Sequence, residues 1–154
     1  MPTDVVRRLY DAFLARDGQA MEDCYAADAT FRDEVFDLTG REEIGGMWKM
    51  LIARGTDLEL TVSDVVEDQA TGSAHWEPTY TFGATGRKVH NIIDATMRIE
   101  DGLIVEHVDR FNFWRWSRQA FGPVGWTLGW TPAVRTKVRI EARKSLDKWL
   151  AGDG

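Results

Sequence analysis

The first part of the chain spaces its hydrophobic residues with the period of an α-helix. One helical face collects the hydrophobic residues of the first segment: Val5, Val6, Leu9, Tyr10, Phe13 and Leu14. Thr3 precedes that face, where a hydroxyl can cap the first turn. Asp17-Gly18 breaks the pattern, and a short second helix then carries Met21, Cys24 and Tyr25. Two helices are therefore expected at the N-terminus.

A third helix is expected after Gly40, beyond a short strand or loop at residues 29–33. Its hydrophobic face contains Ile44, Met47, Trp48, Leu51 and Ile52. Glu42 and Glu43 fall in its first turn, where the helix dipole favours negative charge.

After Gly55 the hydrophobic period changes from helical to two, which is typical of strands. The first two strand-like runs alternate at Leu58, Leu60 and Val62, and then at Ala74, Trp76, Tyr80 and Phe82. Residues 89–99 and 103–113 form two more runs, and Asp101-Gly102 between them is a strong hairpin signal. These patterns predict an α+β fold, with N-terminal helices packed against a curved antiparallel sheet.

The C-terminal part, residues 114–154, predicts a helical turn, a Gly/Pro-rich stretch and a final amphipathic helix. Two interpretations are open for this Trp-rich extension. It could pack on the sheet as a lid or as part of a dimer surface, which is the favoured interpretation. It could also touch a membrane interface, because Trp126, Leu128 and Trp130 lie beside a basic helix.

Length, cysteine content and charge limit the classes of protein to which this chain can belong. A chain of 154 residues is sized for one domain, and no hydrophobic run is long enough to span a bilayer. The N-terminus does not resemble a signal peptide, and a single cysteine, Cys24, is consistent with a cytoplasmic protein. A net charge of −6 argues against a general nucleic-acid binder. Residues 133–150 nevertheless carry six basic and two acidic side chains.

The stretch HVDRFNFWRW, residues 107–116, places two side chains that can transfer protons beside aromatic rings. In a strand, His107, Asp109, Phe111 and Phe113 would share one face. A histidine and a carboxylate beside aromatic rings suit proton transfer in an apolar pocket. The alternative is a core histidine whose ring nitrogens are satisfied by neighbouring polar groups.

Four segments carry a family resemblance: VVRRLYDAF, YAADATFRDEVF, GREEI and DGLIVEHVD. Together with the order of elements, they resemble the nuclear-transport-factor-2-like superfamily, also described as SnoaL-like or ketosteroid-isomerase-like. The resemblance implies a cone with a deep apolar pocket over residues 1–113, with residues 114–154 as its extension. It also implies a homodimer that binds an apolar small molecule.

The resemblance assigns roles to three aspartates. Asp33 stands where ketosteroid isomerases carry the general base, and Asp94 stands where a second aspartic acid meets the oxyanion. Asp109 matches the last-strand acid/base of SnoaL-type cyclases. Two positions depart from the relatives. Leu9 replaces the isomerase's oxyanion tyrosine, with Tyr10 rotated about 100° away on the helix. Ile92 replaces the arginine of limonene-epoxide hydrolases, which makes that activity less favoured.

Counting outward from the turn at Asp101-Gly102 makes Asp94 and Asp109 cross-strand neighbours, about 4.5–5.5 Å apart. Two carboxyls that close in an apolar pocket cannot both ionise cheaply, so one would act as an acid and the other as a base. Two alternatives remain: one aspartate faces solvent and pairs with Arg98 or Arg110, and Asp33 only bonds its own turn.

Six aromatic residues are expected to line the pocket: Trp48, Trp76, Tyr80, Phe82, Phe111 and Phe113. The chain contains no P-loop, dinucleotide fingerprint or G-x-S-x-G motif, and its three histidines lack metal-site spacing. We therefore expect neither a cofactor nor a metal ion. The predicted function is general acid–base proton transfer on an apolar carbonyl-like or polyketide-like compound, by an isomerase, cyclase or dehydratase. The alternative is a non-catalytic ligand-binding or homodimeric association module.

Overall fold

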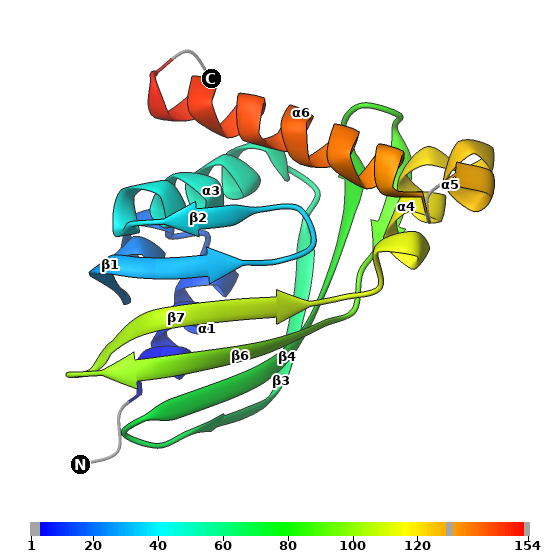
Figure 1. The fold of residues 1–154 in the computed structure, drawn as a ribbon. Helices are drawn as coiled ribbons and strands as arrows, with labels where there is room; N and C mark the ends of the chain where they lie inside the picture. The colour runs from blue at the N-terminus through cyan, green and yellow to red at the C-terminus, as the bar shows by residue number, and fades with distance from the viewer. Residues whose placement is uncertain (1–3, 129–130, 153–154) are drawn as a thin grey trace.

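A curved sheet wraps around the N-terminal helices, and a long C-terminal helix crosses above it (Figure 1). The structure, a computed structural model, describes residues 4–128 and 131–152. The helices within these residues are α1 (Val5–Leu14), α2 (Gly18–Glu22), α3 (Arg41–Arg54), α4 (Phe113–Phe121), α5 (Pro123–Leu128) and α6 (Pro132–Leu150). The strands are β1 (Tyr25–Arg32), β2 (Asp37–Thr39), β3 (Glu59–Glu67), β4 (Thr71–Phe82), β5 (Arg87–His90), β6 (Ile93–Glu100) and β7 (Leu103–Arg110).

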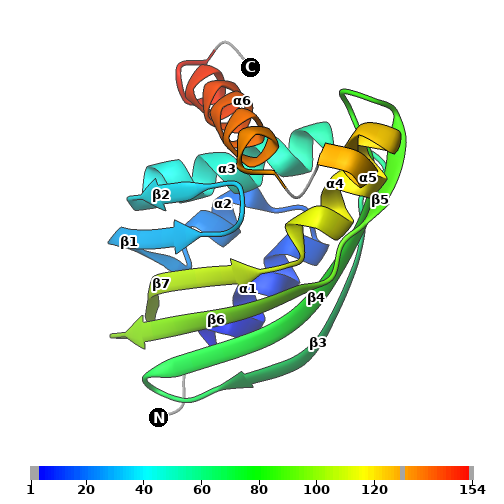
Figure 2. The same cartoon turned by 45° about the vertical axis from the view of Figure 1, so that its right-hand side comes forward.

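The strand order across the sheet is β2-β1-β7-β6-β4-β3, and β5 pairs with β4 outside this path. The meander of β3, β4, β6 and β7 is antiparallel, as predicted. The sheet as a whole is mixed, because β1 pairs with β7 in parallel. Figure 2 shows α1 on the concave side of the sheet, where it packs against β3, β4 and β7. The predicted α+β class is therefore confirmed.

The first residue of α1 and the last residue of α2 differ from the sequence prediction. Thr3, the expected cap, lies outside the described residues, and Asp4 occupies the N-cap position without a side-chain cap bond. The second helix ends at Glu22, and Tyr25 is the first residue of β1. Tyr25 pairs with Ile104 of β7, so tertiary pairing outweighs the local helical pattern.

The β6–β7 hairpin changes register part of the way along its length. Near the turn, Ile99 pairs with Ile104, but one step further Arg98 pairs with Glu106, which leaves Val105 as an extra residue in β7. An extra residue of this kind is a β-bulge, and it exchanges the two faces for the rest of the strand. Beyond Val105, Ala95 therefore faces Asp109 and Asp94 faces Arg110.

Two predicted strands end earlier than their hydrophobic pattern suggests. The run at residues 89–99 divides into β5 and β6, because Asn91 leaves the ladder and donates its backbone N–H to Pro78. The run at residues 103–113 ends at Arg110, and Phe113 begins α4. Asn112 caps that helix by accepting the backbone N–H of Arg115 at 2.9 Å.

The extension packs back onto the cone of its own chain. Leu146 of α6 is fully buried, and Arg143 forms two hydrogen bonds with Glu43 of α3 at 3.1–3.2 Å. Gly46 of α3 permits this packing, because a Cβ there would lie 2.5 Å from the Leu150 side chain. No helix within residues 4–128 and 131–152 combines the length and apolar content needed to cross a bilayer.

Candidate functional site

A chain of hydrogen bonds crosses the interior from α3 to β7. Trp48 Nε1 donates to the Tyr25 hydroxyl at 3.1 Å, and that hydroxyl lies 2.8 Å from His107 Nδ1. His107 Nε2 lies 2.7 Å from Asp109 Oδ1. His107 has no exposed surface and Asp109 is 3 % exposed, so the chain is shielded from bulk water. His107 and Asp109 share the inner face, as predicted from their spacing.

The donors and acceptors determine where the ring proton of His107 lies. An indole N–H only donates, so the Tyr25 oxygen accepts from Trp48, and the buried Tyr25 proton finds an acceptor within these contacts only at Nδ1. Burial raises the pKa of Tyr25 well above its ordinary value, which keeps this proton in place. Nδ1 is therefore the acceptor, and Nε2–H donates to Asp109.

Asp33 contributes a second carboxyl from the loop between β1 and β2. Its Oδ1 accepts the backbone N–H groups of Val35 and Phe36 at 2.7 and 2.6 Å. Burial raises the pKa of Asp33 to about 7, the charge of Asp109 adds to this rise, and the two N–H bonds oppose it. Asp33 thus caps its own turn and also lies within the electrostatic reach of Asp109 and His107.

Two buried polar atoms lack a partner among the described residues: the Tyr10 hydroxyl and Trp76 Nε1. Their rings are neighbours, with centroids 6.3 Å apart. Burial raises the pKa of Tyr10, and the charge of Asp109 raises it further, so the hydroxyl is a protonated donor near that carboxylate. Leu9 and Tyr10 are both buried, so the rotation along the helix does not take Tyr10 out of the interior.

Tyr80 carries a third hydroxyl, which lies within the electrostatic reach of Asp33. Its oxygen accepts Trp116 Nε1–H at 2.8 Å, so its own proton is available to another acceptor. Burial raises its pKa, the bond from Trp116 lowers it, and the charge of Asp33 raises it. The sequence identified Tyr80 only as part of an aromatic wall, because strand alternation carries no signal for the orientation of a hydroxyl.

The expected pairing of Asp94 with Asp109 is wrong. Asp94 lies on the outer face of the sheet, with its side chain 73 % exposed, opposite Arg110 in the ladder. The cause is the bulge at Val105, because the count from the turn assumed an uninterrupted register. Asp94 instead accepts His75 Nδ1–H at 2.8 Å, and the other ring nitrogen of His75 lies 2.7 Å from Glu77.

The six predicted pocket aromatics divide between two hydrophobic clusters. Trp48 and Trp76 belong to the cluster beneath α1 and α3, with ring centroids 6.0 Å apart. Phe113 belongs to the cluster beneath α4, against which Tyr80 and Phe82 pack. Phe111 contacts both clusters, although it lies beyond the end of β7. The aromatic residues therefore do not form one continuous wall.

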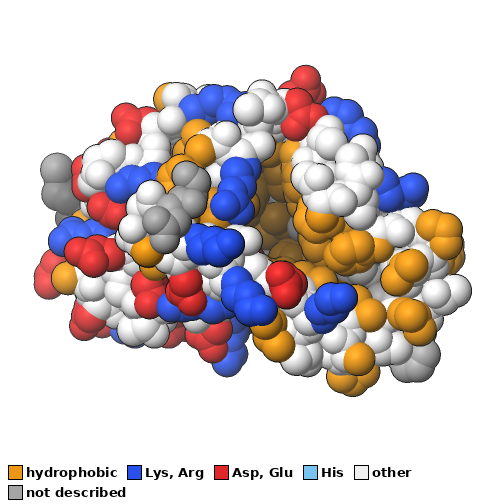
Figure 3. Space-filling model, turned by 90° about the horizontal axis from the view of Figure 1, so that it is seen from above, with side chains coloured by type: hydrophobic (Ala, Val, Ile, Leu, Met, Phe, Trp, Pro, Cys, Tyr) orange, Lys and Arg blue, Asp and Glu red, His pale blue; other side chains and the backbone are white. Residues whose placement is uncertain are grey.

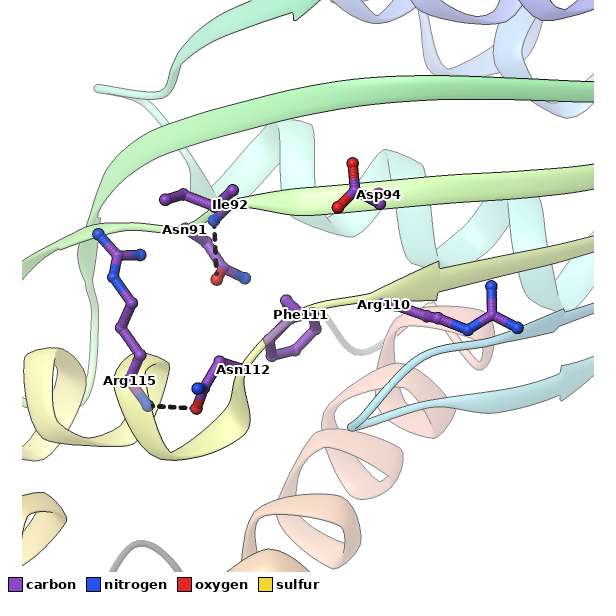
Figure 4. Close-up of a pocket in the computed structure, with 7 residues that line it drawn as sticks. All are labelled: Asn91, Ile92, Asp94, Arg110, Phe111, Asn112 and Arg115. Atoms are coloured by element: carbon purple, nitrogen blue, oxygen red, sulfur yellow. Dashed lines mark hydrogen bonds between the residues drawn. The ribbon is translucent and has the colours of Figure 1, made fainter.

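The molecule is hollowed on the side where α6 crosses the cone. Figure 3 looks down on this side and shows a recess whose visible walls are hydrophobic side chains, with basic side chains on its rim. A pocket of about 360 Å³ opens where β6 begins and β7 ends, lined by Asn91, Ile92, Asp94, Arg110, Phe111, Asn112 and Arg115. In Figure 4 Arg110 points away from this pocket, and the pocket contains none of the buried acid–base residues.

Across residues 4–128 and 131–152, no three His, Cys, Asp or Glu side chains are grouped in a way that could hold a metal ion. The buried site offers acid–base groups from its own residues. It comprises two carboxyls, a histidine with one assigned ring proton, and the hydroxyls of Tyr10 and Tyr80.

A curved sheet wrapped around N-terminal helices is the fold of solved structures described as nuclear-transport-factor-2-like and as ketosteroid-isomerase-like. The chain belongs to the SnoaL-like domain family, which matches residues 6–107. The resemblance in the sequence is thereby confirmed.

Solved structures support the same fold. A ketosteroid-isomerase-like protein from Catenulispora acidiphila, in complex with trimethylamine, has a TM-score of 0.67 at 18 % identity, covering 82 % of this chain and 99 % of its own. IdmH, a proposed polyketide cyclase from Streptomyces antibioticus, has a TM-score of 0.61 at 24 % identity, covering 75 % and 95 %. A limonene-epoxide-hydrolase-like enzyme from Mycobacterium tuberculosis has a TM-score of 0.62 at 14 % identity, covering 75 % and 86 %. No curated protein sequence matches the chain.

Proposed function

We propose that this protein is a cofactor-independent enzyme that transfers a proton on an apolar carbonyl-like or polyketide-like substrate. The observation that carries the proposal is Asp33, whose pKa of about 7 leaves it able to accept or donate a proton near neutral pH. The buried pair of His107 and Asp109 lies within its electrostatic reach. One similar structure is named as a proposed polyketide cyclase, which is one of the enzyme types included in this proposal.

The proposed step begins with removal of a proton from a carbon next to a carbonyl group. Ionised Asp33 or Asp109 accepts that proton, and the electron pair of the C–H bond moves toward the carbonyl oxygen. Tyr10 or Tyr80 donates a hydrogen bond to the oxygen as its negative charge develops. In an isomerisation the carboxylic acid then returns the proton to another carbon of the enolate. In a ring closure the enolate carbon instead bonds to a second carbonyl carbon of the substrate, the electron pair of that carbonyl moves to its oxygen, and this oxygen takes the proton from the carboxylic acid.

His107 has a positioning role in this proposal. Its Nε2–H holds Asp109 Oδ1 at 2.7 Å, which directs the other carboxylate oxygen away from the ring. Tyr25 and Trp48 hold the imidazole through its other nitrogen. Burial raises the pKa of Asp33 and therefore strengthens its carboxylate as a base.

The test measures proton exchange, because it needs no knowledge of the natural substrate. Cyclic ketones such as 2-decalone exchange their α-protons in D₂O when a base abstracts them, and ¹H NMR follows the loss of signal. We expect catalysed exchange by the native protein and a loss of about 10²–10⁴-fold in Asp33→Asn or Asp109→Asn. Asp94→Asn is the matched control, because it makes the same change on the exposed outer face. If all three variants retained the native exchange rate, the proposal would be wrong.

A second candidate is a non-catalytic protein that binds an apolar ligand. The observation in its favour is that Trp48, Tyr25, His107 and Asp109 satisfy one another, as a structural network in a core would. In that case 2-decalone would bind and be recovered without exchange. The native rate of exchange therefore separates the two candidates.

A further inference from the structure

The end of the molecule formed by α4, α5 and the start of α6 exposes hydrophobic side chains to solvent. Val124 is 53 % exposed, Trp126 58 % and Leu128 49 %. Gly125 is the buried residue of α5 and lies so close to the Ser117 carbonyl that a Cβ would not fit. The other side chains of α5 therefore point outward. Figure 3 shows hydrophobic side chains gathered at this end, on the right of the view.

The same end is strongly basic. Residues 111–140 contain five basic side chains and no acidic one, in a chain whose net charge is −6. The basic residues are Arg115, Arg118, Arg135, Lys137 and Arg139. Arg118 lies over the rings of Trp114 and Trp126, at 4.5 and 4.9 Å from their centroids. Charge is partly compensated by Glu34, which lies 3.2 Å from Arg135.

We infer that this end, the surface of α5 and the first turns of α6, docks on an anionic lipid bilayer. Hydrophobic side chains flanked by lysine and arginine can enter the headgroup region while the cations remain at the phosphates. The charge pattern disfavours a second copy of this chain, because a two-fold interface would bring the basic surface against itself. Nucleic acid matches the charge but offers no apolar phase for Val124 and Leu128. The inference does not depend on the proposed reaction.

The proposed contact lies at the surface of the bilayer, at the level of the lipid headgroups. Trp126 is suited to the headgroup level, because its ring is apolar and its N–H can meet a polar group. Lys137 and Arg139 are exposed on the first half of α6, on the side of the molecule where α5 lies (Figures 1 and 2). The basic rim of the recess lies on the face where α6 crosses the cone (Figure 3).

The experiment is flotation of the purified full chain with phosphatidylcholine vesicles that contain or lack phosphatidylglycerol, at low and at high salt. We expect the protein to float with the anionic vesicles at low salt and to be released by high salt. Lys137→Glu should lower the partition coefficient about tenfold, as expected for a lost surface cation. Its matched control is Lys148→Glu, which makes the same change at the far end of α6.

Trp126→Ser should also lower binding about tenfold, whereas Leu14→Ser, at a similarly exposed position on α1, should leave it unchanged. Circular dichroism would establish that each variant is folded. Equal flotation with neutral vesicles, or no flotation with anionic vesicles at low salt, would overturn the inference. So would a lipid-free dimer in analytical ultracentrifugation that dissociates in Trp126→Ser, because the surface would then belong to a second copy.

Discussion

Two histidine–carboxylate contacts lie on opposite faces of the same sheet, and their lengths are nearly equal. On the inner face His107 and Asp109 are 2.7 Å apart, and on the outer face His75 and Asp94 are 2.8 Å apart. The inner side chains are 0 % and 2 % exposed, and the outer ones are 26 % and 73 % exposed. Distance alone therefore does not distinguish a candidate reaction site from a surface ion pair.

The partners at the second ring nitrogen distinguish the two histidines. His107 Nδ1 accepts from the Tyr25 hydroxyl, so one ring proton satisfies both of its contacts. His75 meets a carboxylate at each nitrogen, Asp94 and Glu77, so only the doubly protonated ring satisfies both. The inner histidine thus orients a base, whereas the outer histidine carries a charge that solvent also stabilises.

The largest expected difference between the two contacts is in stability. His107→Ala should lower the free energy of unfolding by about 3–5 kcal/mol, because it leaves the buried Asp109 unpaired and opens a cavity. His75→Ala should cost less than about 1 kcal/mol, because its partners can turn to water. Urea denaturation measures both values. Equal costs would mean that burial does not separate the two contacts.

A pair of tyrosine substitutions isolates the hydrogen-bonded chain within the inner face. Tyr25→Phe removes a hydroxyl that contacts both Trp48 and His107 and should cost about 1–3 kcal/mol. Tyr10→Phe removes a buried hydroxyl without a partner among the described residues, and should be neutral or slightly stabilising. Urea denaturation is again the measurement. A larger cost at Tyr10 would show that its hydroxyl has a partner in solution.

Asp33 extends the comparison to pH. Its pKa is near the ordinary value of about 3.9 in the unfolded chain and about 7 in the folded protein, so folding binds a proton between these values. Stability therefore falls as pH rises from about 4 to 7. Asp33→Asn should raise stability by about 1 kcal/mol at pH 8, below the full linkage value because the carboxyl is partly exposed. Urea denaturation of the native protein and of Asp33→Asn at pH 5 and at pH 8 measures this gain. If the variant were no more stable than the native protein at pH 8, the prediction would be wrong.

The smallest effect is expected on the outer face. Hydrogen bonds that His75 donates to Asp94, and then to Glu77, raise its pKa above the ordinary value, and burial opposes them. The resulting stabilisation is present below the unfolded pKa of about 6.5 and is lost as pH rises through the folded value. In ¹H NMR titrations, Asp94→Asn should lower the pKa of His75, and salt should weaken the effect. A salt-independent pKa would contradict an exposed pair.

The local parts of this structure could be predicted from the sequence. The helical periods of α1 and α3, the alternation in β4 and the turn at Asp101-Gly102 each depend on neighbouring residues. His107 and Asp109 were placed on one face for the same reason. The parallel pairing of β1 with β7 depends on residues far apart in the chain, and Tyr25 was consequently assigned to a helix.

The candidate site was less predictable because its contacts cross several elements. Asp33 has the local signature of a turn aspartate, and only the family resemblance connected it with a pocket. The bonds from Trp48 to Tyr25 and from Trp116 to Tyr80 join side chains with no shared spacing pattern. The predicted position of Asp94 is wrong for a different reason. One unpaired residue in the neighbouring strand shifts the pairing that is counted outward from the turn.

Val105 therefore has a consequence for how length changes in this strand would act. A substitution in β7 alters one side chain, whereas removing Val105 would remove the bulge and leave the later pairs unchanged, from Glu106 opposite Arg98 to Arg110 opposite Asp94. His107 and Asp109 would then still face inward, opposite Met97 and Ala95. A relative that is one residue shorter at this point can thus share the fold and enclose the same reactive groups, at positions that differ by one in a count from the turn.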